Sequence, residues 1–301
     1  MSALPDRPLF SLHVDAEQGF SGGEVQVFLL LEGLRARGQR VLLVAPPQSR
    51  AFVEAQQRGI PAVAVSMRGD LDLPAVFALR REFVRVQPDL VHLHTGRATW
   101  LGGHAARWAG IPAVSTRRMD REVKRNARTR WIYTRLVRRV AAISGPVREL
   151  LVAGGVDPAR IDLVHSSVDP EALRPRRAAG ELRGELGANP GEFVLLVLAA
   201  LVRRKGLDVL LEALALLHAR GTQPTLWIAG EGEERAALEQ LARARGLTRV
   251  RFLGRREDAA ELLGACDALV LPARREGLGV AALQAMAAGR AVIGSAVGGL
   301  A

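Results

Sequence analysis

The chain has 301 residues, 49% of them hydrophobic and 24% charged, which is ordinary for a globular protein and excludes an intrinsically disordered chain. Its length exceeds what one hydrophobic core usually spans, so we expect two domains. The single cysteine, Cys266, excludes an internal disulfide framework, and the longest apolar run, 193–202, is about half as long as a membrane span. Residues 1–10 carry no signal-peptide pattern. These features predict a cytoplasmic protein, with peripheral contact to the inner face of the plasma membrane as the open alternative.

The formal net charge of +11 is carried by arginine, because Lys124 and Lys205 are the only lysines. Codon usage in a GC-rich genome produces such a surplus without any function, so the clusters of charge are more informative than the total. The densest cluster, 117–139, is opposed only by Asp120 and Glu122. It is either a solvated helix whose apolar stripe faces its own core or a surface that contacts anionic lipid or a phosphorylated glycolipid. It contains no nucleic-acid-binding motif, so we expect no nucleic-acid partner.

Short apolar runs alternate with longer amphipathic stretches along the whole chain, which is the pattern of a parallel sheet with crossover helices. Strands are predicted at 9–14, 40–46, 61–66, 89–94, 112–118, 193–202, 225–230, 250–254 and 267–273. Helices are predicted at 24–37, 75–86, 101–110, 207–221, 233–245 and 257–265, with others after Ser144 and after Gly279. Both halves are therefore predicted to be doubly wound α/β domains, in which ligands sit beyond the carboxyl ends of the strands.

The segment between the two halves, 171–191, is rich in proline, glycine and charge and has the composition of a linker. It separates a predicted N-terminal domain, 1–170, from a predicted C-terminal domain, 192–301. The second series stops at Ala301, where IGSAVGGLA begins another strand-to-loop unit. We therefore expect the C-terminal domain to be incomplete.

Three loops of the C-terminal half combine glycine with charge at the predicted carboxyl end of a strand. Each precedes a helix, where backbone N–H groups attract anions, and glycine lets a ligand approach the backbone closely. The loops are Arg203-Arg204-Lys205-Gly206, Gly230-Glu231-Gly232-Glu233 and Arg274-Arg275-Glu276-Gly277-Leu278-Gly279. Each loop alone is a weak signal, because such residues are usually solvated. Their order and spacing are more specific.

That order resembles the C-terminal half of the family 4 glycosyltransferases, which are retaining enzymes with the GT-B fold. The shared motifs are Lys205-Gly206, Gly230-Glu231-Gly232, Phe252-Leu253-Gly254, Asp267 to Pro272, and Glu276-Gly277-Leu278-Gly279. The N-terminal half resembles the family in Ser21-Gly22-Gly23-Glu24-Val25, Asp89 to His94, Ile143-Ser144 and Ser167-Val168-Asp169. The resemblance covers nearly the whole chain. It implies two Rossmann-like domains facing a cleft, with the acceptor on the N-terminal side and the donor on the C-terminal side.

The resemblance also implies roles for individual residues. Lys205 would hold the donor diphosphate, and Glu276 would hydrogen-bond hydroxyls of the donor sugar. Further donor contacts are expected from Gly22, Gly23, Arg203, Arg204, Gly230, Gly277, Leu278, Gly279 and Gln284. The chemistry is consistent, because cations and N–H dipoles stabilise a leaving diphosphate as charge builds on it. The family generally needs no metal, and the sequence has no His/Asp cluster at metal-ligand spacing, so we expect no cofactor.

Three departures from the family concern the substrates. The family's arginine five residues before the lysine is Ala200, so Arg203 or Arg204 is expected to take over the phosphate contact. The second acid is Gln284, which keeps a hydrogen bond to a ribose hydroxyl without the charge. A family histidine near 116–118 is replaced, since that stretch reads Thr-Arg-Arg. These changes either tune the donor or acceptor or mark a loss of activity.

Two histidines, His92 and His94, alternate with apolar residues and so point to one face of their strand. Because ligands bind at the carboxyl end of such strands, His94 is the third catalytic candidate, near the donor sugar. The alternative is that both rings are packed at the strand end. His104 and His165 are interpreted as structural or surface residues.

The combined pattern predicts a retaining glycosyltransferase that moves a sugar from a nucleotide-diphosphate sugar to a cell-envelope glycan or glycolipid, with a lipopolysaccharide-type acceptor favoured. Two alternatives stay open. One is a GT-B nucleotide-sugar epimerase, which would bind the same donor with a different set of acids and histidines. The other is a sugar-nucleotide-binding module without catalysis.

Overall fold

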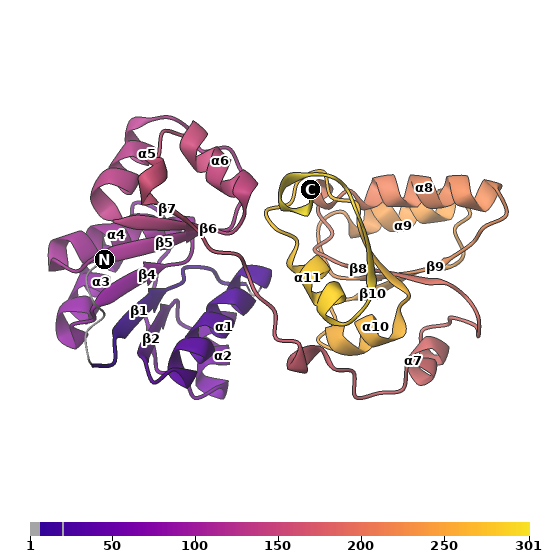
Figure 1. Ribbon diagram of the computed structural model, residues 1–301, viewed down its shortest axis with the longest axis horizontal. Coiled ribbons are helices and arrows are strands. Elements are labelled where there is room, and N and C mark those ends of the chain that lie inside the picture. Colours follow the sequence, from indigo (N-terminus) through magenta and orange to yellow (C-terminus); the bar gives the residue numbers. More distant parts are fainter. Residues whose placement is uncertain (1–6, 20) are drawn as a thin grey trace. The chain divides into compact units, whose positions relative to one another are not determined.

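The computed structural model describes residues 7–19 and 21–301, and the chain divides into two compact units, one ending at Ser166 and one running from Ser167 to Ala301. Each unit is a parallel sheet with helices on both faces (Figure 1). The predicted doubly wound α/β class is therefore confirmed. Most of the segment 1–10, for which the sequence predicts no signal peptide, lies outside the described residues.

The first unit contains a seven-stranded sheet in the order β3-β2-β1-β4-β5-β6-β7 among its described residues. The strands are β1 (Phe10–Val14), β2 (Arg40–Ala45), β3 (Ala62–Ala64), β4 (Leu90–Leu93), β5 (Ala113–Arg117), β6 (Arg139–Ala142) and β7 (Ile161–Leu163). The helices are α1 (Gly22–Ala36), α2 (Arg50–Gln57), α3 (Leu73–Val86), α4 (Gly96–Ala109), α5 (Ala127–Trp131) and α6 (Gly145–Ala153), with a π-helix η1 (Ile132–Leu136) and a 3-10 turn η2 (Pro158–Arg160). The strand order reverses between β1 and β4, which makes their carboxyl ends the expected ligand edge.

The second unit contains a five-stranded parallel sheet in the order β10-β9-β8-β11-β12. The strands are β8 (Val194–Leu198), β9 (Thr225–Ala229), β10 (Val250–Gly254), β11 (Ala268–Leu271) and β12 (Ala291–Gly294). The helices are α7 (Ala179–Glu185), α8 (Leu207–Ala219), α9 (Arg235–Ala244), α10 (Ala259–Ala265) and α11 (Val280–Ala287), with 3-10 turns η3 (Glu171–Leu173), η4 (Arg203–Lys205) and η5 (Gly298–Leu300). Here the order reverses between β8 and β11, so the loops after these two strands share the ligand edge.

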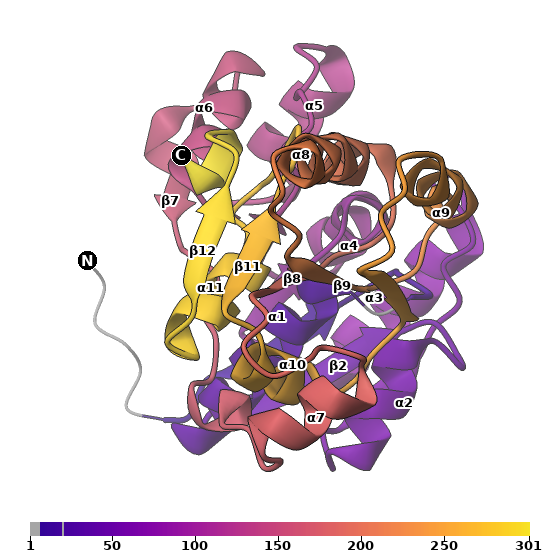
Figure 2. The same ribbon diagram turned by 90° about the vertical axis from the view of Figure 1, so that its right-hand side faces the viewer.

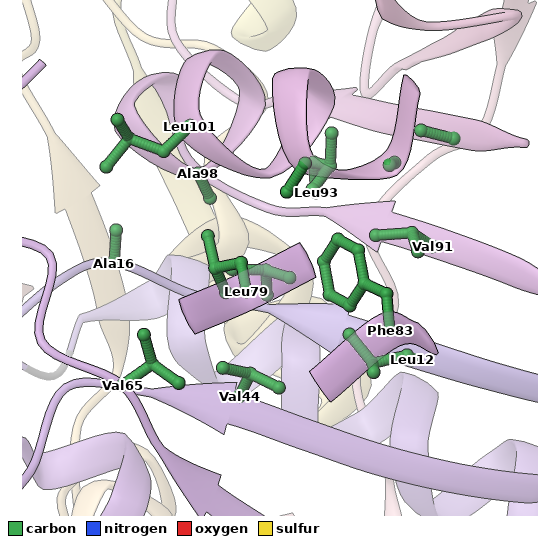
Figure 3. Packing of buried hydrophobic residues seen from close by; sticks show 14 of the residues in the cluster. Leu12, Ala16, Val44, Val65, Leu79, Phe83, Val91, Leu93, Ala98 and Leu101 are labelled. Atoms are coloured by element: carbon green, nitrogen blue, oxygen red, sulfur yellow. The ribbon is translucent and has the colours of Figure 1, made fainter. Parts of the chain in front are cut away.

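Apolar side chains from both faces hold each sheet between its helices. In the first unit, Leu79 and Phe83 of α3 are fully buried and lie among side chains of the sheet and of α4 (Figure 3). Phe28 and Leu31 of α1 bury the opposite face. Replacing a buried phenylalanine such as Phe83 by alanine costs about 3–5 kcal/mol, so these contacts fix the sheet that carries the site.

The second unit is built in the same way, with α8 and α9 on one face of the sheet and α10 and α7 on the other (Figure 2). The segment 171–191, expected as a linker, contributes to this core. Leu173 of η3 and Leu182 of α7 are buried in the same cluster as Leu262 and Leu263 of α10. The structure thus groups the whole of that segment with the second unit.

Several helix boundaries differ from the predicted ones because polar caps decide them. Helix α4 begins at Gly96 rather than 101, since the Thr95 hydroxyl accepts a hydrogen bond from the N–H of Ala98 at 3.1 Å. Helix α2 was missed, although Ser49 caps it by accepting from the N–H of Phe52 at 3.2 Å. Within the part of the chain that the structure covers, no helix combines the length and apolarity that crossing a membrane requires.

Candidate active site

Lys205 and Glu276 meet at the carboxyl edge of the second sheet. Lys205 ends η4, in the loop after β8, and Glu276 lies in the loop after β11. The Lys205 ammonium forms an ion pair with Glu276 Oε2, and the two side chains are only 15% and 12% exposed. The other carboxylate oxygen, Oε1, accepts a hydrogen bond from the N–H of Gly277 at 3.2 Å. The fold therefore brings the two strongest sequence candidates together at the point where the strand order reverses.

Glycines allow the loops around this pair to close on one another. Gly206 follows Lys205 with φ +67°, and a Cβ at that position would overlap the carbonyl oxygen of Pro272. Gly230, at the end of β9, has φ +155°, and a Cβ there would overlap the carbonyl oxygen of Ala199. Any side chain at either position would be strained in its backbone and would also push two loops apart.

The loop from Glu276 to Gly279 packs against residues 298–300. The carbonyl of Glu276 accepts a hydrogen bond from the N–H of Gly299 at 3.0 Å. A Cβ on Gly298 would overlap that same carbonyl oxygen, and a Cβ on Gly279 would overlap the side chain of Leu300. Leu278 lies inside this loop, and Gln284 is half-buried on α11, which starts directly after it. The backbone of 277–279 is thus fixed beside the ion pair.

Arg203 and Arg204 are exposed at the same edge and are tied to the site through their backbone. The N–H of Arg274 donates to the carbonyl of Arg204 at 2.9 Å, and the Arg274 guanidinium donates to the carbonyl of Arg203 at 3.1 Å. That guanidinium also forms two hydrogen bonds of 2.6 Å with the carboxylate of Asp208. Arg274 therefore links the loop of Lys205 to the loop of Glu276 by hydrogen bonds. The sequence predicted no role for it.

The first unit has a second polar edge where β1 and β4 end. Gly22 and Gly23 form the first residues of α1, and Ser21 caps this helix in a capping box with Glu24. The Ser21 hydroxyl accepts from the N–H of Gly23 at 3.2 Å, and Glu24 accepts from the N–H of Ser21 at 2.5 Å. The predicted glycine loop is thus the N-terminus of a helix of 15 residues, a position that attracts anions.

His94 lies directly after β4, 4% exposed, and protein groups surround both of its ring nitrogens. Its Nε2 is 2.9 Å from Nδ1 of His13, and its Nδ1 is 3.3 Å from the Arg118 guanidinium. His92 points to the same side, with its Nε2 2.7 Å from the hydroxyl of Thr116. His94, which the sequence placed near the donor sugar, is therefore engaged with His13 and Arg118, and His92 is engaged with Thr116.

Burial keeps these histidines neutral. It lowers the pKa of His13 to about 3, with the nearby Arg118 charge adding to the effect. The pKa values of His92 and His94 are also lowered well below the usual range, first by burial and then by neighbouring histidines and Arg118. Burial has the opposite effect on Asp15, at the end of β1, and raises the pKa of its carboxyl to about 7.

His13, His92 and His94 are also the group of described residues whose nitrogen atoms lie close enough together to hold a metal ion, within 4.8 Å of one another. Neutral imidazoles suit such a role. The close guanidinium of Arg118 and the hydrogen bond between His13 and His94 both oppose a cation there. We assign no metal to this group.

Asp15, His13 and Arg118 were not predicted from the sequence as members of this edge. The signal in the sequence that could have identified them is the alternation of polar residues along two strands. Ser11, His13 and Asp15 stand two residues apart on β1, and Thr116 and Arg118 stand two apart at the end of β5, so each set points to one face. Such polar alternation is unusual on a buried strand of a parallel sheet.

A surface hollow of about 600 Å³ lies elsewhere in the second unit, lined by residues that include Glu192, Phe193, Gln223 and Arg249. These residues lie at the amino ends of β8, β9 and β10. Ligands of doubly wound sheets bind at the carboxyl ends. We therefore assign the hollow no part in the site.

Two family models match the chain. The model described as Glycosyltransferase Family 4 matches residues 20–172, and the model described as Glycosyl transferases group 1 matches residues 179–301. The first of them alone spans half of the chain. The chain belongs to glycosyltransferase family 4.

The most similar proteins agree with this membership. D-inositol 3-phosphate glycosyltransferase of Mycobacterium ulcerans is 31% identical over 233 residues, which are 70% of this chain and 50% of that protein. The chain spans about half the length of the curated relatives it matches. Among solved structures, Anabaena HepE in complex with UDP-glucose has a TM-score of 0.85 at 23% identity, over 97% of this chain and 82% of that one. The lipopolysaccharide outer core galactosyltransferase WaaB has a TM-score of 0.71 at 17% identity, over 96% and 81%. The GT-B fold expected from the sequence is confirmed.

Proposed function

We propose that the chain is a retaining glycosyltransferase that moves a sugar from a nucleotide-diphosphate sugar to a glycan or glycolipid acceptor. The observation that carries this proposal is the half-buried ion pair between Lys205 and Glu276 at the point where the second sheet reverses its order. A lone buried ion pair contributes little to folding stability, because desolvation offsets most of the attraction. Its position among glycine loops at the ligand edge favours a role in binding.

The pair suggests how the donor is held. Without donor, Lys205 and Glu276 neutralise each other. A diphosphate carries more negative charge than one carboxylate, so it draws the ammonium away and leaves Glu276 free to accept hydrogen bonds from sugar hydroxyls. The N–H groups of the loop from Gly277 to Gly279 lie beside the pair and are candidates for further contacts with the donor. Arg203, Arg204, Gly230 and Gln284 are proposed to complete the donor contacts.

The chemical step follows from this arrangement. As the bond between the anomeric carbon and the diphosphate oxygen breaks, negative charge builds on the leaving oxygen, and Lys205 stabilises it. The acceptor hydroxyl attacks the same face of the sugar, and its proton passes to the departing phosphate, so the anomeric configuration is retained. One donor group aimed at such a developing charge is worth about 3–4 kcal/mol, or about a hundredfold to a thousandfold in rate.

Acceptor binding is proposed for the N-terminal domain, 1–170, and donor binding for the C-terminal domain, 192–301. The relatives are named for D-inositol 3-phosphate, and WaaB is named for the lipopolysaccharide outer core. These names support an acceptor that is a cell-envelope glycan, with a lipopolysaccharide type favoured, or a phosphorylated polyol. UDP-glucose is the first donor to test, because the HepE structure contains it.

The test uses Lys205→Met and Glu276→Gln in the 301-residue chain, with Lys124→Met as the control. Lys124 is the chain's other lysine and is exposed in the first unit. Calorimetry with UDP and a screen of sugar nucleotides for thermal stabilisation should show binding to the control and a loss of tenfold or more in the first two variants. Transfer, with the anomeric product followed by NMR, should fall at least a hundredfold in both. Normal turnover by either variant would contradict the assignment.

The same experiment separates the alternatives. Incubation with donor alone that yields an epimerised sugar nucleotide would replace transfer by epimerisation. Donor binding without turnover across a range of acceptors would favour a binding module.

We also propose a cytoplasmic location with peripheral contact to anionic membrane through residues 117–139. In that stretch Leu136 and Val137 belong to the core, as the structural interpretation of the sequence expected. Trp131 is 40% exposed, with the Arg107 guanidinium 5.6 Å from its ring centroid. Trp108 is also exposed, and tryptophan beside arginine is a typical membrane-interface combination.

Vesicle sedimentation tests this contact. Binding to phosphatidylglycerol vesicles should exceed binding to phosphatidylcholine vesicles and should fall in a Trp108→Ala/Trp131→Ala double variant. Leu216→Ala, which removes an exposed apolar side chain from the second unit, should change nothing. Equal binding of all three proteins to both vesicle types would exclude this surface.

A further inference from the structure

Seven polar residues from three adjacent strands gather on one face at the carboxyl edge of the first sheet. Strand pairing sets His13 beside His92 and Val114 beside His92, which brings β1, β4 and β5 together in that order. The residues are Ser11, His13, Asp15, His92, His94, Thr116 and Arg118. This group fills a place where a doubly wound sheet would normally bury apolar side chains.

The hydrogen bonds through this group run in one direction. The Arg118 guanidinium has only donors, so Nδ1 of His94 is the acceptor at 3.3 Å, and the proton of that ring is on Nε2. His94 Nε2 then donates to Nδ1 of His13 at 2.9 Å. His13 in turn donates from Nε2 to the hydroxyl of Ser11 at 2.9 Å. A second bond, 3.1 Å from the guanidinium to the carbonyl of His94, fixes Arg118 to the end of β4.

The positive charge of Arg118 is not neutralised by an ion pair within the described part of the chain. Among the residues whose placement is described, no carboxylate forms an ion pair with Arg118. The carboxylates of Asp15 and Glu24 interact electrostatically with the guanidinium without forming an ion pair. Glu24 accepts the N–H of Ser21 in the capping box of α1, and Asp15 has an oxygen, Oδ2, without a hydrogen-bond partner. Nε of Arg118 is likewise without a partner.

The surroundings of Arg118 match a phosphate. Its side chain lies next to the start of α1, where a Cβ on Gly23 would be 3.8 Å from its Cδ. The guanidinium offers paired donors for phosphate oxygens, and the helix start adds the favourable end of its dipole. The three histidines nearby stay neutral, since burial lowers their pKa values, so they do not compete for the anion. His94 is the one among them that accepts hydrogen bonds from the guanidinium.

We propose that Arg118 binds a phosphate group of a substrate in the first unit, and that His94 and His13 are positioning residues that hold its guanidinium for this task. The inference rests on the proposed function, because it names a further substrate-binding residue for that reaction. It also assigns His94 a different task from the sugar contact that the sequence suggested, since both ring nitrogens are already used within the protein. The phosphate belongs either to the donor diphosphate or to a phosphorylated acceptor.

The direct test observes Arg118 itself. The ¹⁵N–H signal of its Nε is followed by NMR in the 301-residue chain while inorganic phosphate is added at constant ionic strength. A saturable shift of that signal is expected. Binding of phosphate without any shift of the Arg118 signal would overturn the proposal.

Variants provide the second test, again with inorganic phosphate as the probe. Arg118→Gln should weaken phosphate binding about tenfold or more, and Arg118→Lys should restore part of it because the charge returns. Arg121→Gln, which removes the same charge from an exposed position three residues away, should leave the affinity unchanged. His94→Leu should also weaken phosphate binding, because the leucine side chain no longer accepts a hydrogen bond from the Arg118 guanidinium. Equal affinity in Arg118→Gln and in the wild-type chain would contradict the assignment, even if the lysine variant failed to fold.

Two further titrations identify the source of the phosphate. If UDP moves the Arg118 signal and prevents phosphate from doing so, the donor diphosphate is the ligand. If glycerol phosphate still moves the signal in the presence of saturating UDP, the acceptor carries it. The Lys205→Met variant distinguishes a failure of this proposal from a failure of the proposed function. Loss of UDP binding in that variant with phosphate binding intact supports both proposals, whereas a wild-type chain that binds phosphate at Arg118 but no nucleotide refutes only the proposed function.

Discussion

Both units place their candidate residues at the carboxyl ends of the central strands. They differ in whether the charged side chains there are paired with an opposite charge. In the second unit, Lys205 and Glu276 form an ion pair where β8 and β11 end. In the first, the neutral His94 holds Arg118 where β4 and β5 end, and no described carboxylate pairs with it. The sheet topology decides where a ligand can bind, and the side chains decide whether the site starts out neutralised or charged.

The backbone differs between the two edges as strongly as the charge does. Around Lys205, added Cβ atoms at Gly206 and Gly230 would overlap backbone carbonyl oxygens. At the start of α1, a Cβ on Gly22 would have no atom within 4 Å, and one on Gly23 would have ordinary contacts at 3.5 and 3.8 Å. The edge around Lys205 and Glu276, the proposed donor edge, is therefore built by close backbone packing, whereas the edge in the first unit is built by side-chain hydrogen bonds.

Alanine at Gly206 is expected to have the largest effect. Its φ of +67° and the nearby Pro272 carbonyl combine backbone strain with a clash, so Gly206→Ala should destabilise the second unit by about 3 kcal/mol or more and abolish UDP binding. Gly221→Ala is the matched control, since φ is +81° there but no atom lies within 4 Å. That change should cost about 1 kcal/mol and leave UDP binding intact. Chemical denaturation and calorimetry measure both quantities.

A third variant places the same change in the first unit. Gly22→Ala introduces the methyl group at a helix start with open space, so its effect on the free energy of unfolding should stay within about 0.5 kcal/mol. A loss as large as that of Gly206→Ala would show that the two edges do not differ in the proposed way.

The next largest effect is expected from acid, which should destabilise the first unit at a higher pH than the second. In the folded first unit, His13, His92 and His94 stay neutral, whereas they take up protons near pH 6.5 when unfolded. The unfolded chain therefore binds more protons below that pH, and stability falls as the pH drops, by about 1.4 kcal/mol per pH unit for each histidine. Asp15 acts in the opposite sense, because its raised pKa of about 7 means that the folded chain keeps a proton longer. The net loss should be about 3 kcal/mol per pH unit between pH 6 and 5.

The second unit should lose stability only in stronger acid. Its one histidine, His218, is not buried. Its carboxyls Asp208, Glu212 and Asp258 have pKa values lowered chiefly by hydrogen bonds from arginine, so their contribution is lost as the pH falls below about 4.

Tryptophan fluorescence reports on each unit, because Trp227 is fully buried in the second and the other three tryptophans lie in the first. Chains that keep only Trp227, or only the other three, should show midpoints separated by at least one pH unit. His218→Gln should leave both midpoints in place. A single shared midpoint would refute this difference between the units.

The amino-acid pattern predicted the fold well because apolar runs mark strands directly. Strand β10 was predicted at 250–254 and lies at Val250–Gly254. The predicted strand 193–202 was too long, since β8 ends at Leu198 and the next residues bond to other loops, with the N–H of Leu201 donating to the carbonyl of Glu231 at 2.8 Å. An apolar run cannot show which of its residues leave the sheet.

The candidate sites were predictable to different degrees. Lys205 and Glu276 stood out through motif order, but their direct pairing depends on which strands are neighbours, and no local pattern contains that information. Arg118 was noticed only as a departure from the family. Its contact with His94 depends on the pairing of β4 with β5, in which Leu93 lies beside Ser115. Functions carried by a single motif are visible in a sequence, whereas networks across strands require the register.

The smallest expected effect concerns Arg274, which joins the two loops of the donor edge. Its two 2.6 Å hydrogen bonds to Asp208 are exposed, with side chains 41% and 46% accessible, so Arg274→Ala should cost little stability. Arg245 makes a similar pair of 2.9 Å bonds to Glu212, away from the donor edge and with 49% and 46% exposure.

Arg245→Ala should therefore cost about the same stability. Because only Arg274 also donates to the carbonyl of Arg203, only its loss should loosen the loop of Lys205 and weaken UDP binding, by about twofold to fivefold. Calorimetry should measure the UDP affinity of both variants. The comparison is between the Arg274 ion pair, which is connected to the Lys205 loop, and the Arg245 ion pair, which is not. If both variants bind UDP as the wild-type chain does, the donor edge does not depend on this link, and the backbone glycines alone hold the two loops together.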